Sequence, residues 1–206
     1  MRIAIVGAGN VGQALGSGWR KAGHQPSYAL REATGKNAER VRGAGFDITR
    51  MDEAAARAEA IVLAVPWPGV AEAVKSLGDV SGKVLVDATN PLTPALELAL
   101  GFSDSAAESV ARLVPAALVV KAFNTTGADN MAAARSFKAR PMMPVASDDA
   151  GAKAKVMRLA EDLGFEAIDA GPLRAARLLE PMAMFWIKQA YAQKMGREFA
   201  FALARR

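Results

Sequence analysis

Residues 1–12 read MRIAIVGAGNVG, and this stretch decides the fold. Its apolar run, Arg2–Val6, predicts a buried strand that ends at a glycine. The next six residues, Gly7–Gly12, have the G-x-G-x-x-G spacing, and apolar residues at helical spacing follow over 10–22. A chain with 18 glycines can produce this spacing by chance. A strand directly before it and a helix directly after it are the context that a dinucleotide-binding turn requires.

Each glycine of this motif has its own expected role. Gly7 permits the tight turn, Gly9 lets the backbone approach a pyrophosphate without a Cβ in the way, and Gly12 allows close packing of helix on strand. The first turn of the helix offers free N–H groups and partial positive charge to the phosphates. We therefore expect cofactor contacts from Gly7, Gly9, Asn10, Val11 and Gly12.

Short apolar runs alternate with amphipathic segments along most of the chain. Further strands are predicted at 25–30, 60–65, 83–88, 118–122, 142–146 and 165–170. Further helices are predicted at 34–42, at 70–77, and up to Leu163 from an N-cap at Ser147. Buried strands that alternate with helices indicate an α/β fold, a doubly wound and mostly parallel Rossmann sheet. We predict an NAD(P)-binding domain over 1–170 and a short C-terminal helical extension over 171–206, which is not an independent domain.

Composition excludes several kinds of site. The 206 residues contain no cysteine and one histidine, which rules out disulfides, thiol nucleophiles and Cys-ligated metals, and we expect no metal site. His24 follows a helix-ending glycine and is predicted to be a surface turn residue. No run approaches the ~20 apolar residues of a membrane span, and the N-terminal segment does not resemble a signal peptide. We expect a cytoplasmic protein without a membrane partner.

The formal net charge of +5 invites a nucleic-acid hypothesis. However, residues 174–206 hold seven basic and two acidic residues, so this segment carries the whole excess and the rest of the chain is neutral. The distribution argues against nucleic-acid binding. It predicts instead that the C-terminal segment attracts an anionic acceptor.

The end of the second predicted strand selects between the two nicotinamide cofactors. Arg31 offers a planar fork that suits a 2′-phosphate, and Lys36 lies a turn later. Glu32 is the counter-argument, because an acidic side chain here would accept from a free ribose hydroxyl and repel a phosphate. We favour NADP(H) over NAD(H).

Other predicted strand ends carry distinctive residues, and ligands of open α/β sheets lie at this edge. Trp67 offers a flat surface or packs in the core. Asn90 precedes a proline and either holds the carboxamide of a nicotinamide or forms a simple turn. Lys121 is a proton donor, reaches to solvent, or pairs with Asp87.

Together these segments resemble the NADP-dependent reductases of the deazaflavin coenzyme F-420, and the cytosolic domains of the six-transmembrane metalloreductases. The residues that carry the resemblance are Gly7–Gly12, Val65–Trp67, Asp87–Leu92, Val120–Gly127, Asp169–Leu173 and Leu179–Glu180. One departure is visible: the family commonly has serine before the arginine at the end of the second strand, where this chain has Leu30.

The resemblance implies where each part of the cofactor lies. It places the NADP phosphate at Arg31 and the nicotinamide near Val65, Pro66, Asn90 and the Asn124 loop. Hydride would pass directly between the nicotinamide and a stacked flavin or deazaflavin ring, so no catalytic side chain is expected. Contacts to this acceptor are predicted for Trp67, Asn124, Thr125 and Trp186.

The last predicted helix spans Met182–Met195 and is introduced by Glu180-Pro181. One face carries Met182, Phe185, Trp186 and Ala190, and nearly the opposite face carries Met184, Ile187, Tyr191 and Met195. A helix that is apolar on two sides is usually buried on two sides. We predict a homodimer through this helix, which also walls the acceptor site; the alternative is an internal core helix.

The leading functional hypothesis is an NADPH-dependent reductase of a flavin or deazaflavin-type acceptor. Two alternatives stay open: an imine or keto reductase of the pyrroline-carboxylate kind, and a non-catalytic NADPH-binding sensor. The first alternative normally needs a longer helical domain and a proton donor. The second would bind NADPH without turnover.

Overall fold

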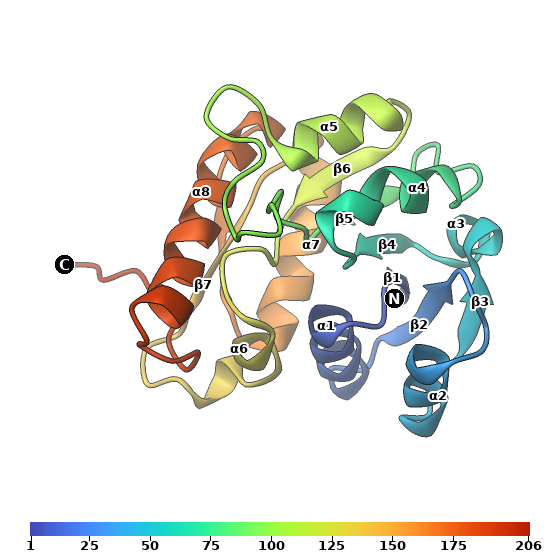
Figure 1. Ribbon diagram of the computed structural model, residues 1–206, viewed down its shortest axis with the longest axis horizontal. Helices are drawn as coiled ribbons and strands as arrows, with labels where there is room; N and C mark the ends of the chain where they lie inside the picture. Colours follow the sequence, from blue (N-terminus) through green and yellow to red (C-terminus); the bar gives the residue numbers. More distant parts are fainter.

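The computed structural model describes all 206 residues and is built around one parallel sheet (Figure 1). The strand order is β3-β2-β1-β4-β5-β6, and every neighbouring pair is parallel. The strands are β1 (Arg2–Val6), β2 (Gln25–Leu30), β3 (Ile48–Arg50), β4 (Ala60–Leu63), β5 (Val84–Asp87) and β6 (Leu118–Lys121). The predicted doubly wound sheet is confirmed.

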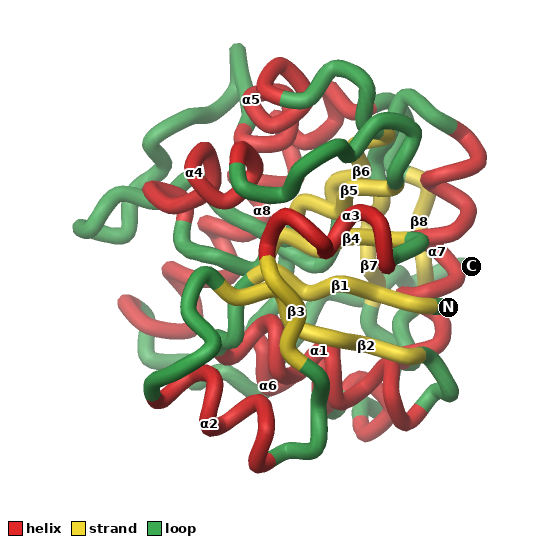
Figure 2. The backbone as a smooth tube through the Cα atoms, turned by 90° about the vertical axis from the view of Figure 1, so that its right-hand side faces the viewer, coloured by secondary structure: helices red, strands yellow, loops and turns green.

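Helices cover both faces of this sheet, as Figure 2 shows. One layer holds α1 (Asn10–Lys21), α2 (Lys36–Gly43), α6 (Ala128–Ala132) and α7 (Ala150–Leu163); the other holds α3 (Ala54–Arg57), α4 (Val70–Lys75) and α5 (Ala106–Leu113). Alternate residues of each strand face opposite layers. In β1, Ile3 and Ile5 join the first core, while Ala4 and Val6 join the second. Both faces of the sheet are therefore buried, which explains why the sequences of the central strands are continuous apolar runs.

The last two strands form a separate small sheet. β7 (Met142–Val145) and β8 (Glu166–Asp169) pair in parallel with each other. They meet the main sheet only through an antiparallel bridge between Lys121 and Ala146. The prediction of a strand at both places is confirmed, but the two do not extend the main sheet in parallel.

The start of α7 differs from the prediction. Ser147 is not the N-cap, because its Oγ donates to the buried carbonyl oxygen of Val119 at 2.7 Å. Asp149 takes that role, and its Oδ1 accepts from the backbone N–H of Ala152 at 2.6 Å. A competing buried acceptor therefore moved the cap by two residues.

His24 is not a surface turn residue. Its Nε2 lies 3.0 Å from Oδ2 of Asp162 on α7, and its side chain is only 14% exposed. The pair joins the loop before β2 to the end of α7. The prediction failed because this partner is far away in the sequence.

The C-terminal helix α8 (Ala176–Ile187) begins earlier than predicted and contains Pro181 in its second turn. A π-helical turn, Lys188–Ala192, follows it, and single 3-10 turns occur at Met51–Glu53, Trp67–Gly69, Ala134–Ser136 and Leu173–Ala175. The predicted faces are wrong in one respect: Trp186 is 3% exposed, whereas Phe185 is 56% exposed. Neighbours on a helix are about 100° apart, so the edge of the buried stripe falls between them. No helix of the protein combines the length and the apolar character that a membrane crossing needs.

Residues 193–206 have no regular structure, and residues 199–201 are packed against the body of the protein while the rest are exposed. The Phe199 ring stacks on Trp186 with centroids 5.2 Å apart, and the Phe201 carbonyl oxygen accepts from Met142 N of β7 at 2.8 Å. Three of the seven basic residues counted above are paired with acidic residues of the body, as Arg177–Glu108, Arg197–Asp129 and Arg205–Glu166. The positive charge predicted to attract an anionic acceptor is therefore partly neutralised.

Candidate functional site

The carboxyl ends of the parallel strands gather five loops at one edge of the sheet. These loops are residues 7–9 after β1, 31–35 after β2, 64–69 after β4, 88–92 after β5 and 122–127 after β6. The residues predicted to bind cofactor or acceptor lie in these loops, apart from Asn10, Val11 and Gly12 in the first turn of α1, Lys36 at the start of α2 and Trp186 on α8.

The glycine turn contains two glycines that the fold requires and one that it does not. Gly7 has a φ of +109°, and a Cβ there would overlap the backbone of Ala64 and lie 2.9 Å from Cγ1 of Val65. A Cβ at Gly12 would overlap the carbonyl oxygen of Gly7. Gly9, in contrast, has a φ of −73°, and a Cβ there would meet no atom within 4 Å. The space beside Gly9 is open, as a backbone that approaches a bound pyrophosphate needs.

The helix that starts at this turn is not capped by any side chain. Gly9 is its N-cap residue, and its first turn, which includes Asn10 and Val11, contains no acidic residue. The first N–H groups of a helix have no intrahelical acceptor, and they carry the positive end of the helix dipole. The turn therefore fits the pyrophosphate of a dinucleotide.

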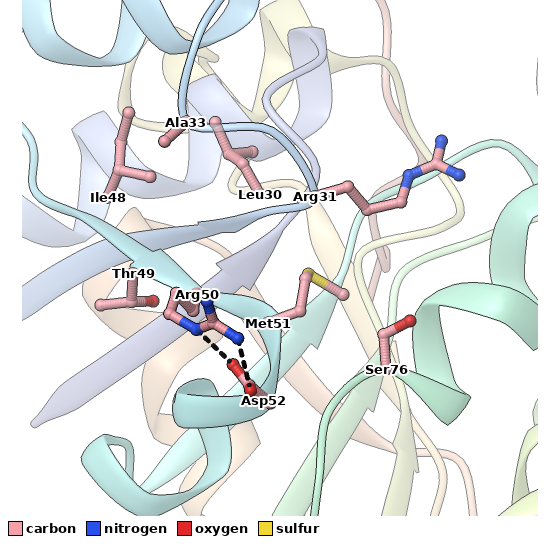
Figure 3. A pocket seen from close by; sticks show the side chains of 9 residues that line it. All are labelled: Leu30, Arg31, Ala33, Ile48, Thr49, Arg50, Met51, Asp52 and Ser76. Carbon is pink, nitrogen blue, oxygen red and sulfur yellow. Dashed lines mark hydrogen bonds and ion pairs between the residues drawn. The ribbon is translucent and has the colours of Figure 1, made fainter.

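A cavity of about 490 Å³ lies at the carboxyl ends of β2 and β3, next to the end of helix α4 (Figure 3). Its lining residues are Leu30, Arg31, Ala33, Ile48, Thr49, Arg50, Met51, Asp52 and Ser76. Arg31 thus lies where the sequence predicted a 2′-phosphate contact, whereas Lys36 is exposed and is not part of the lining. The lining is half apolar, which suits the adenosine end of a nucleotide.

Sequence reasoning missed a second guanidinium in this cavity. Arg50 donates to both carboxylate oxygens of Asp52 at 3.0 and 2.9 Å, and Arg31 Nη1 lies 2.8 Å from Oε2 of Glu72 on α4. Arg50 ends β3, a strand of three residues that was not predicted. The apolar Phe46 and Ile48 after Gly45 were the available signal for it.

Two asparagines join the loops after β5 and β6. Asn90 Nδ2 donates to the Asn124 carbonyl oxygen at 2.9 Å, and Asn124 Nδ2 donates to Asn90 Oδ1 and to the Leu179 carbonyl oxygen, each at 3.0 Å. Phe123 turns the chain into this arrangement with a φ of +59°, a strained value for a side chain of its size. The side-chain amide of Asn90 therefore makes two hydrogen bonds to Asn124, so Asn90 does more than form a simple turn.

One atom of this pair has no partner. Asn124 is 4% exposed, and its Oδ1 accepts no hydrogen bond. Buried polar atoms are rarely left in this state, and an unpaired acceptor costs about 1–3 kcal/mol. Asn124 therefore joins the loops after β5 and β6 through its amide nitrogen, while its side-chain oxygen stays buried without a protein donor.

Lys121 is fully buried between two carboxylates. Asp87 and Lys121 are register partners at the ends of β5 and β6, and Lys121 Nζ lies 2.9 Å from Asp87 Oδ2 and 2.8 Å from Glu180 Oε1 of α8. Its third hydrogen bond goes to the Thr89 carbonyl oxygen at 2.7 Å. Glu180 also accepts from the backbone N–H groups of Ala106 and Ala107 at the start of α5, at 2.9 and 3.3 Å.

The electrostatics of this cluster decide among the three roles considered for Lys121. Burial favours the neutral amine, but the charges of Asp87 and Glu180 outweigh burial and hold the pKa of Lys121 above its ordinary value. Burial also raises the pKa of the Glu180 carboxyl, against the opposing charge of Lys121. With no exposed atom and all three N–H groups used, Lys121 is a structural cation that pairs with Asp87, not a proton donor to a ligand.

The remaining residues predicted to contact the cofactor or the acceptor differ in how exposed they are. Val65 lies against Gly7, Pro66 is exposed, and Trp67 is half-buried against the second core. Thr125 and Trp186 are buried: the Trp186 ring packs on Gly127 and Phe199, and its Nε1 donates to the Phe199 carbonyl oxygen at 2.8 Å. Of the four predicted acceptor contacts, Trp67 alone has open surface. Trp186 supports the loop after β6 and has no free face for a ring to stack on.

Comparisons with known proteins relate this chain to NADP oxidoreductases. A family model described as NADP oxidoreductase, coenzyme F420-dependent, matches residues 2–91. Among curated proteins, metalloreductase STEAP3 of Rattus norvegicus is 28% identical over 183 residues and metalloreductase STEAP2 of Homo sapiens is 26% identical over 189 residues; each alignment covers 89% of this chain. The chain spans only 36% of the length of these relatives.

Solved structures extend the similarity over the whole chain. A protein from Arthrobacter sp. FB24, provisionally assigned as an F420-dependent NADP reductase, has a TM-score of 0.86 at 29% identity, and the alignment covers 98% of this chain and 99% of that one. A hypothetical protein from Sinorhizobium meliloti has a TM-score of 0.74 at 31% identity, over 85% of this chain and 87% of that one. A reductive aminase from Aspergillus terreus, 19% identical over 95% of this chain and 62% of that one with a TM-score of 0.69, shares the fold. This chain is thus similar to NADP oxidoreductases described as coenzyme F420-dependent, over residues 2–91 by the family model and over nearly its whole length by the Arthrobacter structure.

Proposed function

We propose that the protein transfers hydride between NADP(H) and a flavin or deazaflavin-type acceptor. The observation that carries the proposal is the open space beside Gly9 at the uncapped start of α1, with the Arg31 cavity at the same edge of the sheet. This arrangement suits a dinucleotide whose pyrophosphate meets the glycine turn. The match of residues 2–91 to a family model of NADP oxidoreductases supports the choice of NADP(H).

In this proposal the protein binds and orients, and its side chains carry out no chemistry. Residues 7–12 hold the pyrophosphate, Arg31 meets the 2′-phosphate, and Asn90 with Asn124 borders the nicotinamide end. The nicotinamide, when bound, supplies the carbon that donates or accepts hydride. Aligned placement of two rings is sufficient for direct transfer and can remove ~7–11 kcal/mol of barrier. The fully engaged Lys121 agrees with a reaction that needs no protein acid.

The test is NADPH oxidation against a panel of acceptors: FMN, FAD, a deazaflavin, ferric chelates and small imines. We expect turnover with at least one of the flavin-type acceptors. Turnover of the imines alone would replace the proposal with the imine-reductase alternative. Tight NADPH binding without turnover on any acceptor would indicate the sensor.

Arg31→Ala is expected to weaken NADPH binding by about 10- to 100-fold, since a charge-assisted hydrogen bond is worth about 1.5–3 kcal/mol. Binding of NADH, which has no 2′-phosphate, is expected to change by less than about threefold. Fluorescence titration with both nucleotides measures the two affinities. Equal losses for NADPH and NADH would show that Arg31 does not meet the 2′-phosphate.

The proposal includes a homodimer formed through α8. The helix exposes Leu178 and Phe185, and the following turn and residues expose Tyr191 and Met195, each more than half accessible. Apolar side chains of this size are costly to leave in water, which supports a second copy as their cover. Sedimentation at micromolar concentration measures the mass, and a monomer would contradict the dimer. The cytoplasmic location stays a prediction.

A further inference from the structure

Both basic side chains of the nucleotide cavity already have acidic partners. Arg31 pairs with Glu72, and Arg50 pairs with Asp52 through two hydrogen bonds. Two guanidinium groups are therefore balanced by two carboxylates. Each guanidinium that would meet the doubly charged phosphate of NADP thus lies beside a carboxylate before any nucleotide binds.

The hydroxyl groups of the lining offer no replacement donor. Thr49 Oγ1 is directed at the Tyr28 carbonyl oxygen at 3.5 Å, and Ser76 Oγ donates to the Glu72 carbonyl oxygen at 2.9 Å. Leu30, which precedes Arg31, has no polar side-chain atom. A 2′-phosphate in this cavity can therefore take side-chain hydrogen bonds only from guanidinium groups that carboxylates already hold.

Glu72 differs from Asp52 in how it holds its arginine. Asp52 is two residues from Arg50, so this pair is local. Glu72 comes from α4, 41 residues from Arg31, and it ties the end of β2 to the helix on the far side of the cavity. Its carboxylate takes Nη1 of Arg31, one of the nitrogen atoms through which a guanidinium binds a phosphate.

The 2′-phosphate of NADP(H) and the free 2′-hydroxyl of NAD(H) would interact differently with the Glu72 carboxylate. A 2′-phosphate carries about −1.5 to −2 charge at pH 7 and must displace or lie beside Glu72. At 4 Å in water, each pair of like unit charges costs about a factor of five in affinity. The free 2′-hydroxyl of NAD instead brings a donor, which a carboxylate accepts. The same residue thus opposes one cofactor and suits the other.

We infer that Glu72 is a specificity-determining residue, which competes with the 2′-phosphate for Arg31 and narrows the preference for NADP(H) over NAD(H). The inference rests on the proposed function, because it takes the cavity to be the site of the adenosine ribose. It assigns a role to an exposed residue outside the glycine motif.

The test compares Glu72→Gln with Glu161→Gln, which removes the same charge from an exposed position on α7. Dissociation constants for NADPH and NADH are measured at low salt and at 0.5 M salt. We expect Glu72→Gln to tighten NADPH binding by about 3- to 10-fold, whereas NADH binding should stay the same or weaken by less than about twofold. The gain for NADPH should shrink at high salt, because exposed charges are screened. Glu161→Gln is expected to leave both constants unchanged.

The double variant Arg31→Ala/Glu72→Gln separates a direct effect from a general one. If Glu72 acts through Arg31, its replacement is expected to change NADPH binding by less than about twofold when Arg31 is absent. An unchanged NADPH-to-NADH ratio in Glu72→Gln, or an equal shift in Glu161→Gln, would overturn the inference and leave the proposed function in place. A wild-type protein that binds neither nucleotide would overturn both.

Discussion

Lys121→Met is expected to lower the free energy of unfolding by about 3–5 kcal/mol, as the loss of one partner from a buried ion pair does. The substitution leaves the Asp87 and Glu180 carboxylates facing each other without their shared cation, in a place that water does not reach. The raised pKa of Lys121 has the same origin as this stability: both reflect how strongly the folded protein favours the charged ammonium. Urea denaturation followed by circular dichroism measures the change.

The control for this prediction is Lys155→Met, which removes the same group from an exposed position of α7. Its free energy of unfolding should stay within about 0.5 kcal/mol of the wild type. Glu180→Gln is a milder second variant, because Lys121 keeps Asp87; we expect a loss of about 1–3 kcal/mol, since the amide nitrogen replaces one of the two oxygens that accept from the N–H groups at the start of α5. Equal stability of Lys121→Met and Lys155→Met would contradict the account.

Gly9→Ala is expected to leave stability almost unchanged and to weaken NADPH and NADH binding alike by at least about tenfold. The backbone at Gly9 has a φ that alanine adopts freely, and the added Cβ meets nothing in the free protein. The methyl group would instead occupy the space proposed for the pyrophosphate, which both nucleotides share. Thermal unfolding and nucleotide titration measure the two effects separately.

Gly12→Ala is the matched comparison, because its Cβ would overlap the Gly7 carbonyl oxygen within the protein itself. This variant should lose stability whether or not nucleotide is present. If Gly9→Ala bound both nucleotides with wild-type affinity, the pyrophosphate could not lie against residue 9. That result would remove the observation on which the proposed function depends.

The first part of the fold was predictable because its signals are local. The predicted bounds of β1 and β2 match the structure to the residue, and α1 ends within one residue of the prediction. The missed elements β3, α3 and α6 have three to five residues, which is too short for a hydrophobic period to appear. The eight-residue helix α5, capped by Ser105, was also missed after a long loop.

The sequence predicted where the site residues lie better than it predicted which residues they contact. Arg31, Asn90 and Asn124 lie at the edge where the sequence placed them, since the ends of parallel strands share that edge. Their partners could not be read from the sequence: Glu72 lies 41 residues from Arg31, and Glu180 lies on a helix that reaches back to β6. Trp186 was misjudged for the same reason, because the segment that covers its ring follows it in an irregular conformation.

The ion cluster also bears on how this protein can change during evolution. Lys121, Asp87 and Glu180 come from two strands and the C-terminal helix, yet each depends on the others: loss of Lys121 leaves two buried carboxylates uncompensated, and loss of either carboxylate leaves buried donors without their acceptor. A well-packed apolar trio of similar volume would be as stable or more so. Homologues are therefore expected to keep all three residues or to replace them together, so that the C-terminal helix and the sheet are inherited as one unit. An alignment in which position 121 varies independently of positions 87 and 180 would contradict this.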